Sequence, residues 1–374
     1  MIKSKCFIVV TVFIAVTCQN TLSQALPDKA SILKKTVLAN DYFMKEYPDP
    51  SQPIVTNITR PSNIWTRGVY YEGLMELYGI DPQQKYLQYV LEWSSFHKWQ
   101  PAYNTKTRDA DNQCCGQTYL ALYQIDKEPE RVRYIKECID SIIATDKIND
   151  WSWIDAMQMA MPVYAKLGVV CHDDRYFKRM YEMHTHTKKM LFNSQEGLWW
   201  RDSTFLPPYK EPNGQNCYWS RGNGWVVAAL VRVLKVIPRT TVGYRDYKNT
   251  YLAMMKALLP LQRNDGFWNV SLKDPEHFGG KEASGTSLFL YGMAWGVEKG
   301  WLDRKTYMPA IIKAWNGLAN EALHPDGMLG YVQGTGKEPR DGQPVGFDHL
   351  PDFRDYGVGC FLLAGSEVYK LASK

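Results

Sequence analysis

Residues 225–231 of the chain read Trp-Val-Val-Ala-Ala-Leu-Val, an apolar run with no polar face. The run lies in a segment with helical periodicity, and a helix that is apolar on most sides is buried on most sides. Such helices are expected in the inner layer of a double-layered helical toroid, where a second layer separates them from water. This stretch therefore favours an all-α protein with two concentric rings of helices.

Helical periodicity continues over most of the chain, and few alternating runs indicate strands. Glycine or proline occurs where helices should end or begin, at Gly79, Pro129, Gly168 and Gly300. The expected helices are 30–47, 65–78, 83–98, 112–125, 129–144, 152–167, 173–191, 222–236, 244–262, 284–299, 303–320 and 355–371. Twelve helices suit an (α/α)6 barrel. A helical-repeat solenoid would require self-similarity at a fixed period, which the sequence lacks.

Residues 1–25 have the features of a secretory signal peptide. Lys3 and Lys5 precede the apolar run 6–16, and Ser23-Gln24-Ala25 forms a small-x-small cleavage pattern. The run is shorter than the roughly 20 residues that a spanning helix needs. We therefore expect an exported protein, periplasmic or secreted, with no membrane association once the signal is removed. No linker divides the remainder, so residues 26–374 are expected to form a single domain.

The composition argues against a nucleic-acid partner and is compatible with a carbohydrate ligand. The 44 Lys and Arg residues against 39 Asp and Glu give a net charge of +5, without the concentrated basic residues expected of a nucleic-acid binder. The chain contains 13 Trp, 24 Tyr and 13 Phe residues. Aromatic rings stack on sugar faces as well as filling cores, so this enrichment is compatible with a carbohydrate ligand.

Cysteine and histidine give no sign of a metal centre. The six cysteines beyond the signal are too sparse for a disulfide scaffold, and most are expected to be buried small hydrophobes. The seven histidines form no HExxH motif, and no CxxC pair exists. We expect no metal ligands.

Two segments contain candidate catalytic carboxylates. Asp111 lies in 108–113, Arg-Asp-Ala-Asp-Asn-Gln, where a helix cap is the simpler interpretation. Asp155 lies inside an apolar helical run, beside Trp153 and Met157. A buried carboxyl group costs several kcal/mol unless it is paired or protonated, and an apolar environment raises its pKa, as a general acid requires. A structural carboxylate bonded to loop backbone remains the alternative.

A third segment is Trp-Ser-Arg-Gly-Asn-Gly-Trp at 219–225, which opens a buried helix. Two tryptophans and Arg221 around two glycines suggest an anion bound beside stacking faces at a helix N-terminus. The alternative is a tight turn in which Arg221 caps neighbouring carbonyl groups.

Taken together, these motifs resemble the unsaturated glucuronyl and rhamnogalacturonyl hydrolases of glycoside hydrolase families 88 and 105, and family 105 more closely. The resemblance spans most of the chain in order, and its most specific part is the run 219–225. The other matching segments are Trp65-Thr66-Arg67-Gly68-Val69 with Gly73-Leu74, Asp111 to Gly116, Trp153-Ile154-Asp155 with Met159-Ala160-Met161-Pro162, and His324-Pro325-Asp326-Gly327.

The resemblance implies an (α/α)6 barrel that needs no metal or organic cofactor. It implies oligosaccharide substrates with a 4,5-unsaturated uronic acid at the non-reducing end, as polysaccharide lyases leave, and hydration of the C4=C5 bond. Asp155 would then protonate C4 and activate the water added at C5, while Asp111 would contact sugar hydroxyls. Further residues implied to bind substrate are Trp153, Trp219, Arg221, Trp225 and Arg67.

One position departs from the family pattern. Some relatives have a histidine after the Gly-Leu-aromatic-aromatic run, whereas this chain has Arg201 after Gly197-Leu198-Trp199-Trp200. Arg201 would lie near the leaving sugar and favour an anionic or sulfated neighbour, unless it forms a surface salt bridge. Two other functions stay open: an (α/α)6 glycosidase or epimerase acting on a saturated substrate, and an exported carbohydrate-binding protein without catalysis. The sequence identifies neither the parent polysaccharide nor the oligomeric state.

Overall fold

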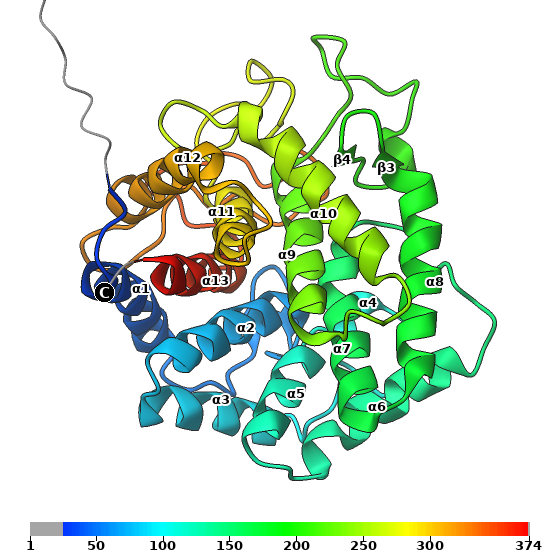
Figure 1. Ribbon diagram of the computed structural model, residues 1–374. Coiled ribbons are helices and arrows are strands. Elements are labelled where there is room, and N and C mark those ends of the chain that lie inside the picture. The colour runs from blue at the N-terminus through cyan, green and yellow to red at the C-terminus, as the bar shows by residue number, and fades with distance from the viewer. Residues whose placement is uncertain (1–24, 373–374) are drawn as a thin grey trace, which may run out of the picture.

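The computed structural model describes residues 25–372, and these form a fold built from helices (Figure 1). The all-α expectation is confirmed. In chain order the α-helices are α1 (Lys29–Glu46), α2 (Trp65–Ile80), α3 (Gln84–Phe96), α4 (Ala110–Gln113), α5 (Gly116–Ile125), α6 (Glu130–Ile143), α7 (Asp155–Cys171), α8 (Asp174–Leu191), α9 (Ser220–Val236), α10 (Tyr244–Leu258), α11 (Ala283–Glu298), α12 (Arg304–Asn316) and α13 (Asp355–Leu371). Two short antiparallel pairs accompany them, β1 (Ile54–Val55) with β2 (Thr59–Arg60) and β3 (Phe192–Asn193) with β4 (Leu198–Trp199).

The helices form two layers. An inner ring closes through contacts of α13 with α2 and α11, of α9 with α11 and α7, and of α5 with α2 and α7. Each inner helix has an outer partner: α1 packs on α13, α3 on α2, α6 on α5, α8 on α7, α10 on α9 and α12 on α11. This alternation of inner and outer helices is the (α/α)6 toroid that the sequence predicts.

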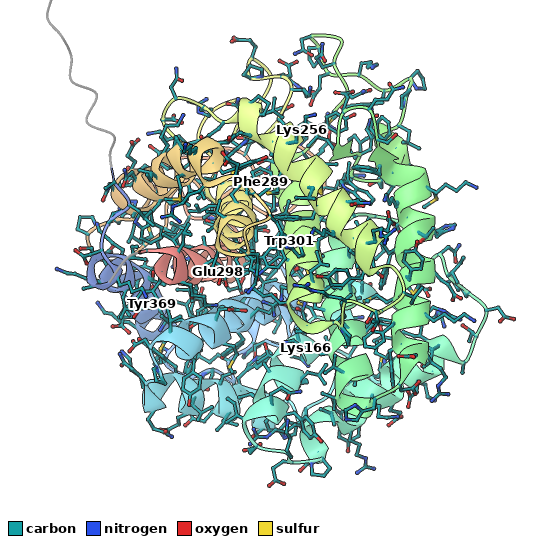
Figure 2. The ribbon with its side chains drawn as sticks, in the orientation of Figure 1. Lys166, Lys256, Phe289, Glu298, Trp301 and Tyr369 are labelled. Carbon is teal, nitrogen blue, oxygen red and sulfur yellow. The ribbon has the colours of Figure 1, made fainter. Side chains whose placement is uncertain are left out.

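Burial follows the layers. Every residue of α11 from Ala283 to Val297 is buried, and α9 is buried from Ser220 to Leu234, in keeping with their apolar sequences. Side chains fill the space between the helices, Phe289 of α11 among them (Figure 2). The rings also require small residues, because a Cβ atom on Gly73 of α2 would lie 2.4 Å from the carbonyl oxygen of Gly359 on α13.

The loops that precede the inner helices meet at one end of the barrel. Since each outer helix returns the chain, the inner helices all run in one direction and their N-termini share a face. Backbone hydrogen bonds join these loops: Leu272 N–H donates to Tyr218 O at 2.9 Å, and Ala283 N–H donates to Tyr331 O at 2.7 Å. Residues far apart in sequence are thereby held together around the mouth of the inner ring.

The helix boundaries differ from the prediction at a few points. The helix expected at 112–125 is divided into α4 and α5, and the helix expected at 152–167 begins at Asp155. Asp155 is therefore the first residue of α7, which corrects its expected position inside the helix. The segments expected at 244–262 and 303–320 end in a 3₁₀ turn, η2 (Leu259–Leu261), and a π-helical turn, η3 (Gly317–Ala322).

Residues 1–24, which contain nearly all of the predicted signal peptide, lie outside the described residues. Among the helices from residue 25 to residue 372, none combines the length and the apolar character needed to cross a membrane. Six cysteines occur in this part of the chain, all without a disulfide partner, and five of them are buried. Their expected role as small buried side chains agrees with this.

Candidate active site

Asp155 occupies the N-terminus of α7 at the mouth of the inner ring, and 8% of its surface is exposed. The preceding residues pair with the segment that follows β4: Ile154 N–H donates to Arg201 O at 3.0 Å, and Trp153 forms an antiparallel bridge with Asp202. These backbone bonds fix the side chains of Asp155 and Arg201 next to each other, although 46 residues separate them in sequence.

Asp111 comes from α4, a single helical turn that packs against α7. Its backbone N–H donates to the carboxylate of Asp109, which caps the turn, at 3.0 Å. The cap that the sequence suggested therefore belongs to Asp109, and the Asp111 side chain is left for another use. Burial, with the charges of Asp109 and Asp155, raises the pKa of Asp111 to about 8. Because α4 packs against α7, Asp111 and Asp155 lie in one region of the mouth, where the charge of Asp155 acts on Asp111.

Arg201 is the cation of the site. Its Nε donates to Asp155 Oδ2 at 3.2 Å, and its Nη1 donates to Asp202 Oδ2 at 2.8 Å. Burial raises the pKa of Asp155, and the charge of Arg201, followed by that of Arg221, opposes the rise. Of the two roles considered for Arg201, the structure shows an ion pair, formed with the carboxylate expected to act as the acid.

The Trp-Ser-Arg-Gly-Asn-Gly-Trp run begins α9 beside this pair. Arg221 is 1% exposed and donates from Nη1 and Nη2 to the carbonyl oxygens of Gln333 and Gly334, both at 2.7 Å. Its guanidinium lies over the Trp219 ring, 4.6 Å from the centroid. Trp219 Nε1 donates to Gln333 Oε1 at 2.9 Å. The guanidinium thus binds carbonyl groups, as in the alternative interpretation, but these belong to a loop more than 100 residues away in sequence.

Two other predicted binding residues lie in the interior. Arg67 of α2 is 2% exposed, pairs with Asp355 of α13 at 3.2 Å and lies 4.5 Å from the centroid of the Tyr47 ring. Trp225 of α9 is 1% exposed and contacts Trp65 edge to face at 6.2 Å. The structure therefore brings Asp155, Asp111, Arg201 and the 219–221 segment to the mouth, and places Arg67 and Trp225 in the packing beneath it.

Sequence reasoning missed two residues that shape the site. Gln333 is fully buried, accepts from Trp219 and donates from Nε2 to the carbonyl oxygen of Asp341 at 2.6 Å. Asp202 accepts from Nη1 of Arg201, whereas Asp155 accepts from Nε, so Asp202 is a second anchor of this arginine. Both residues lie in irregular loops, where no periodicity marks a side chain as inward. The only available signal for Asp202 was its position directly after Arg201.

One group in the described part of the chain has the composition of a metal site. Ligand atoms of Glu211, Asp274 and His277 lie within 4.8 Å of one another. They also bond to each other and to their surroundings: His277 Nδ1 lies 2.7 Å from Glu211 Oε2, Ser271 Oγ donates to Glu211 Oε1, and Asn213 N–H donates to Asp274. These bonds account for the arrangement as a join between two loops.

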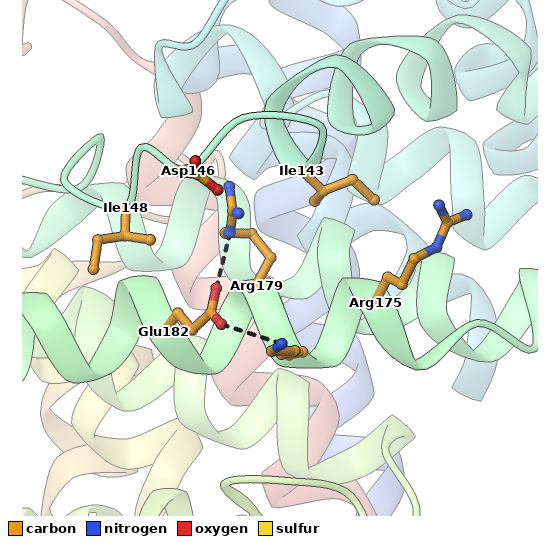
Figure 3. Close-up of a pocket in the computed structure, with 7 residues that line it drawn as sticks. Ile143, Asp146, Ile148, Arg175, Arg179 and Glu182 are labelled. Carbon is orange, nitrogen blue, oxygen red and sulfur yellow. Dashed lines mark hydrogen bonds and ion pairs between the residues drawn. The ribbon is translucent and has the colours of Figure 1, made fainter.

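A cavity of about 480 Å³ opens on the outer layer, away from the carboxylates (Figure 3). It is lined by residues of α6, of α8 and of the segment between α6 and α7. Arg179 and Glu182, neighbours on α8, form an ion pair in its wall at 3.1 Å. None of the predicted site residues lines this cavity.

The comparisons with known proteins bear on the family and the fold. The family model described as Glycosyl Hydrolase Family 88 matches residues 36–372. An unsaturated 3S-rhamnoglycuronyl hydrolase of Formosa agariphila is 32% identical over 327 residues, 82% of this chain and 84% of its own. A protein with the same name from Alteromonas sp. is 28% identical over 329 residues, 82% of this chain and 78% of its own. The solved structure of a glycosyl hydrolase family 88 protein from Bacteroides vulgatus superimposes with a TM-score of 0.85 at 31% identity, covering 92% of this chain and all of the other.

The helical toroid with carboxyl groups at the mouth of its inner ring fits a glycosidase, and the family match and the relatives show this class. The chain belongs to glycoside hydrolase family 88. The predicted family resemblance and the assignment as a glycosidase are thereby confirmed. Structural neighbours also include a family 105 glycoside hydrolase of C. acetobutylicum, at 22% identity and a TM-score of 0.72, which supports the shared fold. The closer resemblance to family 105 stays a prediction.

Proposed function

We propose that this glycosidase removes a 4,5-unsaturated uronic acid from the non-reducing end of oligosaccharides by hydrating the C4=C5 bond. The observation that carries the proposal is the pair of carboxyl groups at the mouth of the inner ring, Asp155 with Asp111, whose pKa values are both raised by burial. Protonation of an enol-ether carbon requires a carboxylic acid with a raised pKa. Family membership supplies the context for this chemistry.

The reaction then balances as follows. The Asp155 carboxyl group transfers its proton to C4, a water molecule adds its oxygen to C5, and the Asp155 carboxylate accepts the proton that this water loses. The product is a hemiketal at C5. The hemiketal opens to a ketone, the sugar chain leaves from C1 as an alcohol, and C1 becomes an aldehyde. Asp155 ends in its starting protonation state. Asp111 holds sugar hydroxyls so that C4 faces the acid.

The leaving sugar that we propose is a sulfated rhamnose. Support comes from the two relatives named unsaturated 3S-rhamnoglycuronyl hydrolase and from the positive charge of Arg201 at the site. We also propose that the protein is exported, because residues 1–25 have the pattern of a secretory signal. Sequencing the N-terminus of the mature protein recovered from the periplasm and from the medium tests the export.

The test of the reaction is the ultraviolet absorbance of the double bond conjugated to the uronate carboxylate. Wild type should remove this absorbance from lyase-generated oligosaccharides. Asp155→Asn, which keeps size and polarity but cannot supply a proton, should lower the rate by about 10²–10⁴-fold, the range typical of general acid catalysis. Circular dichroism of the variant controls for folding. Release of reducing sugar with unchanged absorbance would instead indicate a glycosidase acting on a saturated substrate.

A further inference from the structure

The Arg201 guanidinium has one side without a protein partner. Nε bonds to Asp155 and Nη1 to Asp202, whereas Nη2 has no hydrogen-bond partner among residues 25–372. The side chain is 20% exposed, and Nη2 is one of its solvent-accessible atoms, where a ligand can reach it. A guanidinium presents its donors in a rigid fork suited to the oxygens of carboxylate and sulfate groups.

The ion pair with Arg201 opposes the protonated state that Asp155 needs in order to act as a general acid. A cation that bonds to a carboxylate favours its ionised form, whereas a general acid must carry a proton. Asp202 is itself fixed, because its Oδ1 accepts from Thr204 N–H at 2.9 Å and from Thr204 Oγ1 at 2.6 Å. Arg201 is thus held in place by two carboxylates, and both N–H groups of its Nη2 are left for a new partner.

We propose that Arg201 is a positioning residue that couples substrate binding to the acid: it keeps Asp155 ionised until an anionic oxygen of the substrate binds at Nη2, and Asp155 then takes up its proton from solvent. No movement of the arginine is needed. The added anion offsets the positive charge that Asp155 experiences, so the proton is acquired where the double bond is waiting. This inference rests on the proposed function, since it concerns the same acid.

The other charged groups around Asp155 do not change the direction in which a bound anion shifts its pKa. Asp111 faces it from α4 and Arg221 from α9. The charge of Arg201 lowers the pKa of both Asp111 and Asp155, so a substrate anion on Arg201 raises both. Because the two carboxyl groups interact, their titration steps belong to the pair.

The test measures proton uptake by calorimetry in two buffers of different ionisation enthalpy. The probe is a saturated uronyl-rhamnose with a 3-sulfate, which binds without being hydrated. On binding the probe, wild type should take up a fraction of a proton per site. This fraction should approach one at a pH where Asp155 and Asp111 are ionised in the free enzyme. Arg201→Met should take up none. Equal uptake by Arg201→Met, no uptake by wild type, or no binding of the probe would overturn the proposal. The calorimetric test involves no turnover. Failure of the proposed hydration is detected separately, by the absorbance assay.

Two further arms sharpen the result. Uptake with the sulfated probe but not with its desulfated form assigns the anion to the leaving sugar, and uptake with both assigns it to the uronate carboxylate. In pH profiles of kcat/KM, the basic limb should move up by about 1–3 pH units in Arg201→Met, as for loss of an adjacent cation. It should move down in Asp202→Asn, where the charge of Arg201 acts on Asp155 alone. A structural role of Arg201 would lower activity without shifting the limbs in these opposite directions.

Discussion

Replacing Asp111 by Asn should stabilise the protein at neutral pH. The pKa of Asp111 is about 8 in the folded protein, against an ordinary value of 3.8. An acid whose pKa is raised by folding contributes its full stability below the unfolded pKa and loses it as the pH rises toward the folded pKa. For Asp111 the window of loss therefore runs from about pH 4 to about pH 8. Asn has no proton to lose, so the variant avoids this penalty.

The magnitude follows from the two pKa values. At about 1.36 kcal/mol per pH unit, the penalty in wild type grows by about 2.7 kcal/mol between pH 5 and pH 7. The stability of Asp111→Asn relative to wild type should therefore rise by up to about 2.7 kcal/mol over this range. The figure is an upper limit, because Asp111 and Asp155 interact and their titration steps belong to the pair.

Urea unfolding of both proteins at pH 5, 6 and 7 measures this difference. Asp109→Asn is the matched control, because an Asn oxygen can still cap α4 while the loss of charge lowers the pKa of Asp111. The stability of Asp109→Asn relative to wild type should also rise from pH 5 to pH 7, but by less than that of Asp111→Asn. A relative stability of Asp111→Asn that stays constant or falls from pH 5 to pH 7 would refute the reasoning. The stabilised variant should also turn over more slowly, since Asp111 is proposed to hold the sugar.

Two further predictions concern the inner ring. Asp355→Ala leaves the buried Arg67 guanidinium without its partner and should lower the free energy of unfolding in urea by about 3–5 kcal/mol. A loss below about 1 kcal/mol would mean that the pair does not join α2 to α13. Gly73→Ala places a Cβ atom against the Gly359 carbonyl oxygen and should lower stability by about 1–3 kcal/mol. Gly79→Ala on the same helix is the control, because the added Cβ meets nothing there and stability should not fall. Equal melting temperatures for the two variants would contradict the close approach of α2 and α13.

The helices were predictable because their signal is local. The apolar run 225–231 and the glycine and proline stops depend on residues within one or two turns, and each predicted helical range has a counterpart in the toroid. Errors occur where a distant segment decides the backbone. Residues 152–154 have helical neighbours in sequence, but Ile154 bonds to the Arg201 backbone and Trp153 to Asp202, so the helix cannot begin before Asp155.

The charge state of the site could not be predicted in the same way. From sequence, Asp155 is a lone carboxylate in apolar surroundings, an environment that raises its pKa. The structure keeps that burial and adds Arg201, whose sequence position gave no hint of contact with Asp155. Burial and the ion pair act on the pKa in opposite directions, and only their sum determines whether the group carries a proton. Pattern reasoning can therefore propose Asp155 as the acid, but the protonation of this group depends on a pairing across 46 residues that only the folded backbone creates.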